Sequence, residues 1–202
     1  MDREGILMIV SGPSGSGKGT VVKEVVKEDN YALSISVTTR RPRPGENEGE
    51  HYFFRTKDEF KKLIEEDKLL EWARFCDNYY GTPLHYVQQQ MKEGKNVILE
   101  IEVDGALQVK EKYPDAVLIF LMPPTIGELR RRLDRRGTES PEIIERRIRR
   151  AETELDLLSK YDYVVINDDI NEAKEDILKI VDAEKMSVKR NNNIKRKFKG
   201  EI

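Results

Sequence analysis

The sequence is poor in cysteine and histidine, and it has no long run of apolar residues. Cys76 is the only cysteine in 202 residues, so an internal disulfide is excluded and nothing indicates an oxidising compartment. The histidines, His51 and His85, stand apart in the chain, and we expect each to be a surface or loop residue rather than a catalyst. Neither a signal peptide nor a transmembrane span is apparent, so we expect a cytoplasmic protein.

Net charge is also small, at −2, although 37% of the residues are charged. This balance gives no electrostatic basis for nucleic-acid or membrane binding, and we expect neither partner. The length suits one domain with small inserted subdomains.

A glycine-rich segment near the start organises the chain. An apolar run, Ile6 to Ser11, indicates a buried strand, and a helix is expected from Val21 to Lys27. Between them lie Gly12, Pro13, Ser14, Gly15, Ser16, Gly17, Lys18, Gly19 and Thr20. Strand, GxxxxGK spacing, lysine and helix together favour a phosphate-binding loop over an ordinary glycine-rich turn.

Gly19 departs from the usual pattern, which has Ser or Thr directly after the lysine. Thr20 comes one residue later, so a direct contact between a hydroxyl and magnesium is less expected. We expect any magnesium to be held near Thr20 and Glu100, through water.

The region from about 36 to 82 interrupts the alternation of strands and helices, and we interpret it as an inserted, strand-rich subdomain. A strand is expected over 33–37, followed by a loop with Arg40, Arg41 and Arg43 between prolines. Three arginines in one rigid loop suit phosphate binding, although a solvated basic turn explains them too. Further on we expect a short strand at 52–55, a helix that begins at a Thr56–Glu59 capping box, a strand over 69–75 and a turn over 78–83.

Carboxylates follow the next buried strand, expected over 96–102. Glu100 and Glu102 would share one face by the two-residue period of a strand. Acidic residues at the carboxyl end of a parallel strand, downstream of a phosphate loop, commonly orient magnesium and its waters. An exposed strand end is the alternative. Strands are also expected over 116–122 and 163–167, and a last helix over 170–185.

Nine arginines and no lysine lie between 125 and 159, where two helices are expected around Ser140 and Pro141. Arginine without lysine favours bidentate contact with phosphate and predicts a lid. Pairing with Glu128, Glu142, Glu145 and Glu152 along exposed helices is the alternative for some of them. The basic tail, 186–202, is expected to be frayed.

Two separate cationic sites imply two phosphorylated substrates and therefore phosphoryl transfer between them, whereas a GTPase switch or a motor needs only the loop and the acidic strand end. Guanine presents adjacent N–H donors that a carboxylate accepts, and adenine lacks this pair. Glu71 lies among apolar neighbours, where a carboxylate needs a partner. With Glu102, Ser36 and Thr82, it favours a guanine acceptor.

The chain resembles the guanylate kinase family over about residues 6 to 183. The resemblance rests on segments in the expected order: GPSGSGKGT, SVTTRRPRPGE, the HYF run, LLEWARF with NYYGT, ILEIEVDGA, RRLDRRGTES and VVINDD. It implies an α/β fold, a P-loop parallel-sheet core with helices on both faces (about 1–35, 83–124 and 160–185), a mobile GMP-binding insert (36–82) and a helical lid (125–159). The implied reaction is ATP + GMP ⇌ ADP + GDP with Mg²⁺.

The resemblance also implies roles for individual residues. The GMP phosphate would be held by Arg40, Arg43, Tyr52 and Tyr80, and guanine by Ser36, Glu71, Thr82 and Glu102. ATP would lie on the phosphate loop, with Lys18 at the transferring phosphates, lid contacts from Arg132, Arg136 and Arg147, and Asn167 near adenine. Lys18, Arg40, Arg132 and Arg147 would act in catalysis.

Asp104 is a second departure, because Gln is common there in the family. Two alternatives remain: a kinase for another nucleoside monophosphate, and a guanylate-kinase-like interaction module without activity. Modules of that kind typically lack an intact phosphate loop, and this chain has one. The sequence does not define an oligomeric state.

Overall fold

Two β-sheets organise the chain in a computed structural model that describes residues 4–135, 137, 140–191 and 193–201. The larger sheet is parallel throughout, with the strand order β2-β7-β1-β8-β9. Its strands are β1 (Leu7–Ser11), β2 (Tyr31–Leu33), β7 (Asn96–Glu100), β8 (Val117–Met122) and β9 (Tyr163–Ile166). β1 lies at the centre, so the glycine-rich loop leaves the middle of the sheet at its carboxyl edge.

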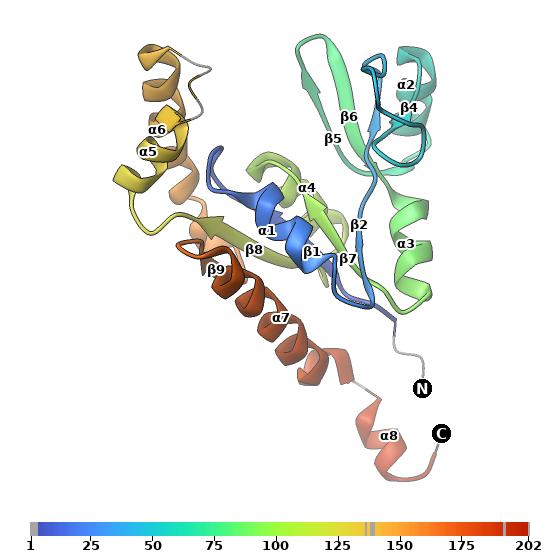
Figure 1. The fold of residues 1–202 in the computed structure, drawn as a ribbon. Helices are drawn as coiled ribbons and strands as arrows, with labels where there is room; N and C mark the ends of the chain where they lie inside the picture. The colour runs from blue at the N-terminus through green and yellow to red at the C-terminus, as the bar shows by residue number, and fades with distance from the viewer. Residues whose placement is uncertain (1–3, 136, 138–139, 192, 202) are drawn as a thin grey trace.

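Helices cover both faces of this sheet, as the sequence predicts (Figure 1). One face packs against α1 (Lys18–Val25) and α7 (Ile170–Met186) through an apolar cluster that includes Val22 and Ile177. The other packs against α3 (Leu84–Lys92) and α4 (Val103–Lys112). The central strands are buried on both sides, which explains their unbroken apolar runs.

The second sheet is built from the inserted region and has the order β4-β3-β6-β5. Its strands are β3 (Val37–Thr38), β4 (Phe53–Phe54), β5 (Leu69–Phe75) and β6 (Asn78–Pro83), with α2 (Lys57–Glu65) beside them. The capping box of α2 is present, because the Thr56 hydroxyl accepts from the Glu59 N–H and Glu59 accepts from the Thr56 N–H. A small apolar cluster around Phe60 holds this unit together.

The remaining helices are α5 (Ile126–Arg135) and α6 (Pro141–Leu155), with a 3₁₀ turn at Leu158–Lys160. Leu129 and Leu133 of α5 pack against Ile144 and Ile148 of α6. This pair and the second sheet rise on opposite sides of the phosphate loop, both beyond the carboxyl edge of the large sheet (Figure 1).

Two predicted elements in the inserted region were wrong. The strand expected over 33–37 is split between the two sheets, and the link bonds to each: Ser34 N–H donates to Ile98 O and Phe53 N–H to Ser36 O. The turn expected over 78–83 is strand β6. Gly81 within this strand allows a close backbone approach, since a Cβ there would lie 2.8 Å from Glu71 O.

The strand expected over 96–102 ends at Glu100, and α4 was missed altogether. Glu102 is the N-cap residue of α4, so the expectation that Glu100 and Glu102 share a strand face is wrong. The buried residues Val103, Ala106 and Val109 follow a helical period. Because this helix begins only three residues after β7, which is itself an apolar run, its period was not recognised in the sequence.

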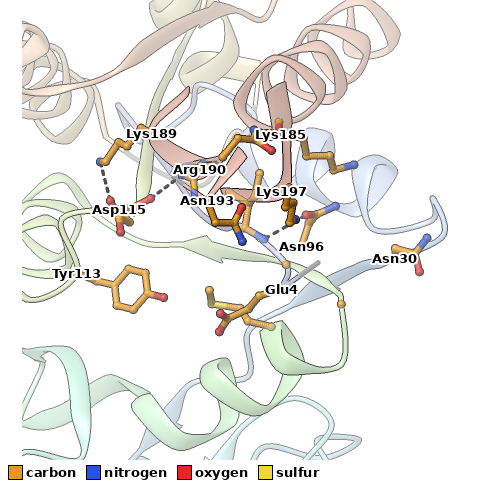
Figure 2. Close-up of a pocket in the computed structure, with 15 residues that line it drawn as sticks. Glu4, Asn30, Asn96, Tyr113, Asp115, Lys185, Lys189, Arg190, Asn193 and Lys197 are labelled. Carbon is orange, nitrogen blue, oxygen red and sulfur yellow. Dashed lines mark hydrogen bonds and ion pairs between the residues drawn. The ribbon is translucent and has the colours of Figure 1, made fainter. Parts of the chain in front are cut away.

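The basic tail is helical rather than frayed, with a 3₁₀ turn at Val188–Asn191 and the short α8 (Ile194–Phe198). Lys189 pairs with Asp115 at 2.7 Å, and Arg190 donates to the Asp115 carbonyl (Figure 2). Arg190 also donates to Glu184 at 2.8 Å. These contacts fasten the start of the tail to the core. Within the described ranges, no helix is long and apolar enough to cross a membrane.

Candidate active site

The phosphate loop has the backbone shape that its glycines permit. Gly12, Gly15 and Gly17 have φ values of 136°, 94° and 92°, which side-chain-bearing residues rarely adopt. A Cβ at Gly12 would lie 2.3 Å from Leu121 O, and one at Gly17 would lie 2.4 Å from Asn167 Nδ2. The loop is therefore closely packed against β8 and the residue after β9.

Lys18 is the first residue of α1 and is 9% exposed. Its ammonium donates to the carbonyls of Gly12 at 2.6 Å and Pro13 at 3.1 Å, so the side chain folds back over the loop. A positive charge and a helix N-terminus thus meet at one point, which favours an anion.

Glu100 stands beside the loop, because β7 runs parallel to β1 with Val10 opposite Glu100. A Cβ at Gly19 would lie 3.2 Å from Glu100 Oε1, so the carboxylate occupies the side where residue 19 would project. Desolvation raises the pKa of Glu100, and the charges of Lys18 and Lys23 oppose that shift. Thr20 is exposed in the first turn of α1.

Two arginines of the α5–α6 pair reach the phosphate loop. Arg132 donates to Ser16 O at 3.3 Å and to Asn167 O at 2.8 Å, and Arg147 donates to the Ser14 hydroxyl at 2.6 Å. Arg136 lies outside the described residues.

Other arginines of this pair contact carboxylates on the helices themselves, in keeping with the alternative interpretation. Arg130 pairs with Glu145, Arg131 with Glu128, and Arg150 with Glu154. Thr125 and Glu128 also have the spacing of a capping box, of which one half is present: the Glu128 N–H donates to the Thr125 hydroxyl, while the Glu128 carboxylate pairs with Arg132.

Asn167 directly follows β9 and connects this strand to the phosphate loop through a hydrogen bond. It is 3% exposed, and its Nδ2 donates to Ser16 O at 2.7 Å. Its Oδ1 is buried and accepts no hydrogen bond from the part of the chain that the structure describes. An acceptor is thus available next to the loop.

The arginine loop of the insert is held by an acid that sequence analysis missed. Arg40 donates to Glu46 at 2.8 Å, and the Arg43 N–H donates to the other oxygen of that carboxylate at 2.8 Å. Arg40 lowers the pKa of Glu46 to about 2. The only sequence signal was an acid three residues after Arg43.

Two tyrosines complete this cationic group. The Arg40 guanidinium lies 5.4 Å from the centre of the Tyr52 ring, and the rings of Tyr52 and Tyr80 are 6.3 Å apart. Arg40, Tyr52 and Tyr80 are thus brought together, whereas Arg43 is exposed.

Glu71 is buried in β5, with 6% of its surface exposed. The Thr82 hydroxyl, on the neighbouring β6, donates to Glu71 Oε1 at 2.7 Å. Desolvation raises the pKa of Glu71, and the bond from Thr82 partly offsets the shift. Glu102 is more open, and Arg150 donates to it at 3.1 Å.

A cavity of about 150 Å³ joins the insert to the end of β7. Ser36, Tyr52 and Thr82 line it from one side and Glu100 from the other, and His51 stands at its exposed edge. His51 Nδ1 accepts the Asn47 N–H at 3.2 Å. Four of the predicted site residues therefore surround one small space.

A larger hollow, of about 780 Å³, lies elsewhere, between the N-terminal segment, the turn before β8 and the tail (Figure 2). It contains no residue of the phosphate loop or of the arginine loop. Its cations Lys189 and Arg190 are already paired with Asp115 and Glu184. Ser36, Tyr52, Thr82 and Glu100 line the smaller cavity instead.

Comparison with known proteins agrees with this geometry. The family model described as guanylate kinase matches residues 4–184. The guanylate kinase of Caldanaerobacter subterraneus subsp. tengcongensis is 52% identical over 200 residues, covering 98% of this chain and 97% of that protein. The guanylate kinase of Desulfitobacterium hafniense is 52% identical over 187 residues, covering 92% and 94%.

The chain belongs to the guanylate kinase family.

A solved guanylate kinase, from Anaplasma phagocytophilum, is 33% identical and has a TM-score of 0.72, covering 94% of this chain and 90% of that one. Membership of the guanylate kinase family confirms the predicted P-loop kinase fold and makes the chain an ATP:GMP phosphotransferase.

Proposed function

We propose that GMP binds between the insert and the end of β7, and that ATP binds on the phosphate loop. The observation that carries this assignment is the buried Glu71 carboxylate, whose Oε1 accepts the hydroxyl of Thr82, a residue that lines the cavity. A buried carboxylate requires donors, and guanine N1–H and N2–H₂ supply them. Ser36 and Thr82 offer hydroxyls to O6 or N7, and Glu102 adds a second carboxylate.

The GMP phosphate lies at the group formed by Arg40, Tyr52 and Tyr80, with Arg43 approaching from the exposed side. The Arg40 guanidinium donates to the Glu46 carboxylate. Phosphate oxygens replace carboxylate oxygens in this scheme, so the guanidinium is already oriented when GMP arrives. Arg40 then shields the charge of the attacking phosphate.

The ATP phosphates lie over the loop from Gly12 to Thr20 and accept from its backbone N–H groups, of which Pro13 has none. Lys18 exchanges the Gly12 and Pro13 carbonyls for the transferring phosphates, and Arg132 and Arg147 exchange Ser16, Asn167 and Ser14 for phosphate oxygens. Arg136 is proposed to join them. Asn167 lies near adenine, where its free Oδ1 can accept a hydrogen bond from an amino group.

In-line transfer then requires positioning and charge stabilisation rather than covalent chemistry from the protein. Lys18, Arg40, Arg132 and Arg147 spread the charge of the moving phosphoryl group. We infer that the insert (36–82) and the lid (125–159) close over the substrates, which excludes water as a competing acceptor.

The oxygens near the loop fit Mg²⁺. This ion prefers one or two carboxylates together with phosphate oxygens and water, and Glu100 beside Gly19 supplies a carboxylate at the right edge of the sheet. Glu100 would hold the ion through water, with the Thr20 hydroxyl nearby. When bound, Mg²⁺ supplies charge neutralisation at the phosphates.

The alternatives are less well supported. The loop is intact, which disfavours a module that only binds proteins, and the buried Glu71 disfavours an adenine acceptor. A cytoplasmic enzyme with no nucleic-acid or membrane partner remains part of the proposal, because the net charge is −2.

GMP affinity should fall on acidification, and the fall should begin at a higher pH than for an ordinary carboxylate. The pKa of Glu71 is raised in the free protein, and guanine N–H donors favour the ionised form. The affinity for GMP is therefore at its full value above this raised pKa, where Glu71 is ionised. It weakens below it by at most about tenfold per pH unit for one proton. Calorimetric titration with GMP from pH 7.5 to pH 5 measures the effect.

Glu71→Gln is the control, because it retains the titration of the GMP phosphate and removes that of residue 71. The pH dependence of the variant should be shallower than that of the native protein. An equal dependence of GMP affinity on pH in the two proteins would contradict the proposal that Glu71 binds guanine.

A further inference from the structure

The two oxygens of the Glu71 carboxylate are in different situations. Oε1 accepts the Thr82 hydroxyl at 2.7 Å, whereas Oε2 accepts no hydrogen bond from any described residue. Glu71 is 6% exposed, so the approach to Oε2 is controlled by the few residues around it. A base whose two adjacent N–H donors bind both oxygens of this carboxylate must reach Oε2.

Gly105 lies directly against that oxygen. It is a buried residue in the first turn of α4, and a Cβ built on it would lie 3.1 Å from Glu71 Oε2. The next neighbours, Ile101 Cδ1 at 3.4 Å and Glu71 Cδ at 3.6 Å, are at ordinary contact distances. A methyl group at position 105 would therefore press on the free oxygen and on little else.

The backbone at Gly105 does not itself call for glycine. It lies within an α-helix and is not among the glycines with positive φ. In the interior of an ordinary helix, alanine is more favourable than glycine. Glycine at position 105 therefore makes the helix locally less stable than alanine would. In return, it leaves the space beside Glu71 Oε2 open.

We propose that Gly105 is a specificity-determining residue of the acceptor site, which keeps Glu71 Oε2 open to the N–H edge of guanine. This proposal rests on the proposed reading of guanine by Glu71. Gly105 makes no bond itself and acts by the absence of a side chain. The first turn of α4, which belongs to the core, thus shapes a base site to which the insert contributes Ser36, Glu71 and Thr82.

Gly105→Ala tests the proposal. We expect the dissociation constant and KM for GMP to rise about tenfold or more, because a covered carboxylate oxygen loses its hydrogen bond to the base. Binding of a non-hydrolysable ATP analogue should stay within about twofold, and the urea midpoint should be unchanged or higher because alanine favours the helix. Calorimetry, steady-state kinetics and urea unfolding give the three readouts.

Gly127→Ala is the matched control. Gly127 lies in the first turn of α5, where a Cβ would meet only Thr125 Oγ1 at 3.8 Å. This variant makes the same exchange in a helix remote from Glu71, so GMP affinity should not change.

Unchanged GMP affinity in folded Gly105→Ala would overturn the proposal. Glu71→Gln, measured alongside, separates that failure from a failure of the proposed function: if Glu71→Gln weakens GMP binding while Gly105→Ala does not, only the role of Gly105 falls. If neither variant does, the reading of guanine by Glu71 falls as well.

A loss of stability in Gly105→Ala would be resolved by adding Glu71→Ala. Recovery of the urea midpoint in the double variant would support the contact with the carboxylate. A midpoint that stays low would show that Gly105 serves close packing of α4, and would contradict the proposal.

Discussion

Lys18→Met should lower kcat by about 10³-fold or more while leaving a folded protein. The ammonium is a full positive charge built into the phosphate loop, and such groups act mainly on the charge that develops during transfer. Methionine keeps the length of the side chain and removes the charge. Turnover is measured by coupled ADP formation, and folding by urea unfolding.

Lys27→Met is the control for this experiment. Lys27 follows α1 and pairs with Glu24 at the surface, so its loss should leave kcat within about twofold, in keeping with the small value of exposed ion pairs. Near-normal turnover in Lys18→Met would remove Lys18 from the catalytic group.

Glu71→Gln should reduce kcat/KM for GMP by about 10³-fold and leave the KM for ATP within about twofold. The Thr82 hydroxyl donates to Oε1, so it selects the carbonyl oxygen of the new amide and turns the NH₂ group toward the base. Donor then meets donor, and a buried mismatch of this kind rejects a ligand by roughly 10³–10⁴-fold.

Initial rates with GMP varied at saturating ATP, and the reverse, separate the two effects. The opposite result is an equal loss in both titrations, which would indicate a general disturbance of the fold rather than a role in reading the base. Thr82→Val is a useful companion, because it removes the donor that orients residue 71 and should weaken GMP less than Glu71→Gln does.

The phosphate loop could be predicted from sequence because its determinants are local. The glycines at 12, 15 and 17 set the backbone, and the apolar run before them sets the strand. The two sheets, by contrast, divide a single alternating segment at 34–36, and hydrogen bonds to Ile98 and Phe53 decide where the division falls. Those partners are distant in sequence.

The residues of the candidate site could be named from the sequence, but the hydrogen bonds and ion pairs between them could not. Glu71 was singled out because a carboxylate among apolar residues needs a partner, yet its bond to Thr82 depends on the register between β5 and β6. Residues 78–83 were predicted as a turn, so the pairing of β5 with β6 was not foreseen. The pairing of Glu46 with Arg40 could not be predicted from sequence either, because it depends on how the loop that contains both residues folds back on itself.

The arginines illustrate why residue counting has limits. Their number predicted phosphate contacts, but Arg130, Arg131 and Arg150 pair with glutamates, while Arg132 and Arg147 reach the phosphate loop. Which arginine faces the loop depends on how α5 and α6 pack through Leu129, Leu133, Ile144 and Ile148. Helical period alone does not fix that orientation.

The most direct test of guanine recognition by Glu71 is ADP formation from ATP and Mg²⁺ with GMP, AMP, UMP or CMP offered in parallel as acceptor. We expect strong turnover with GMP and rates at least about 10³-fold lower with the other three, because none of them presents two adjacent donors to Glu71. Comparable turnover with AMP, or none with any acceptor from folded protein, would contradict this mechanism.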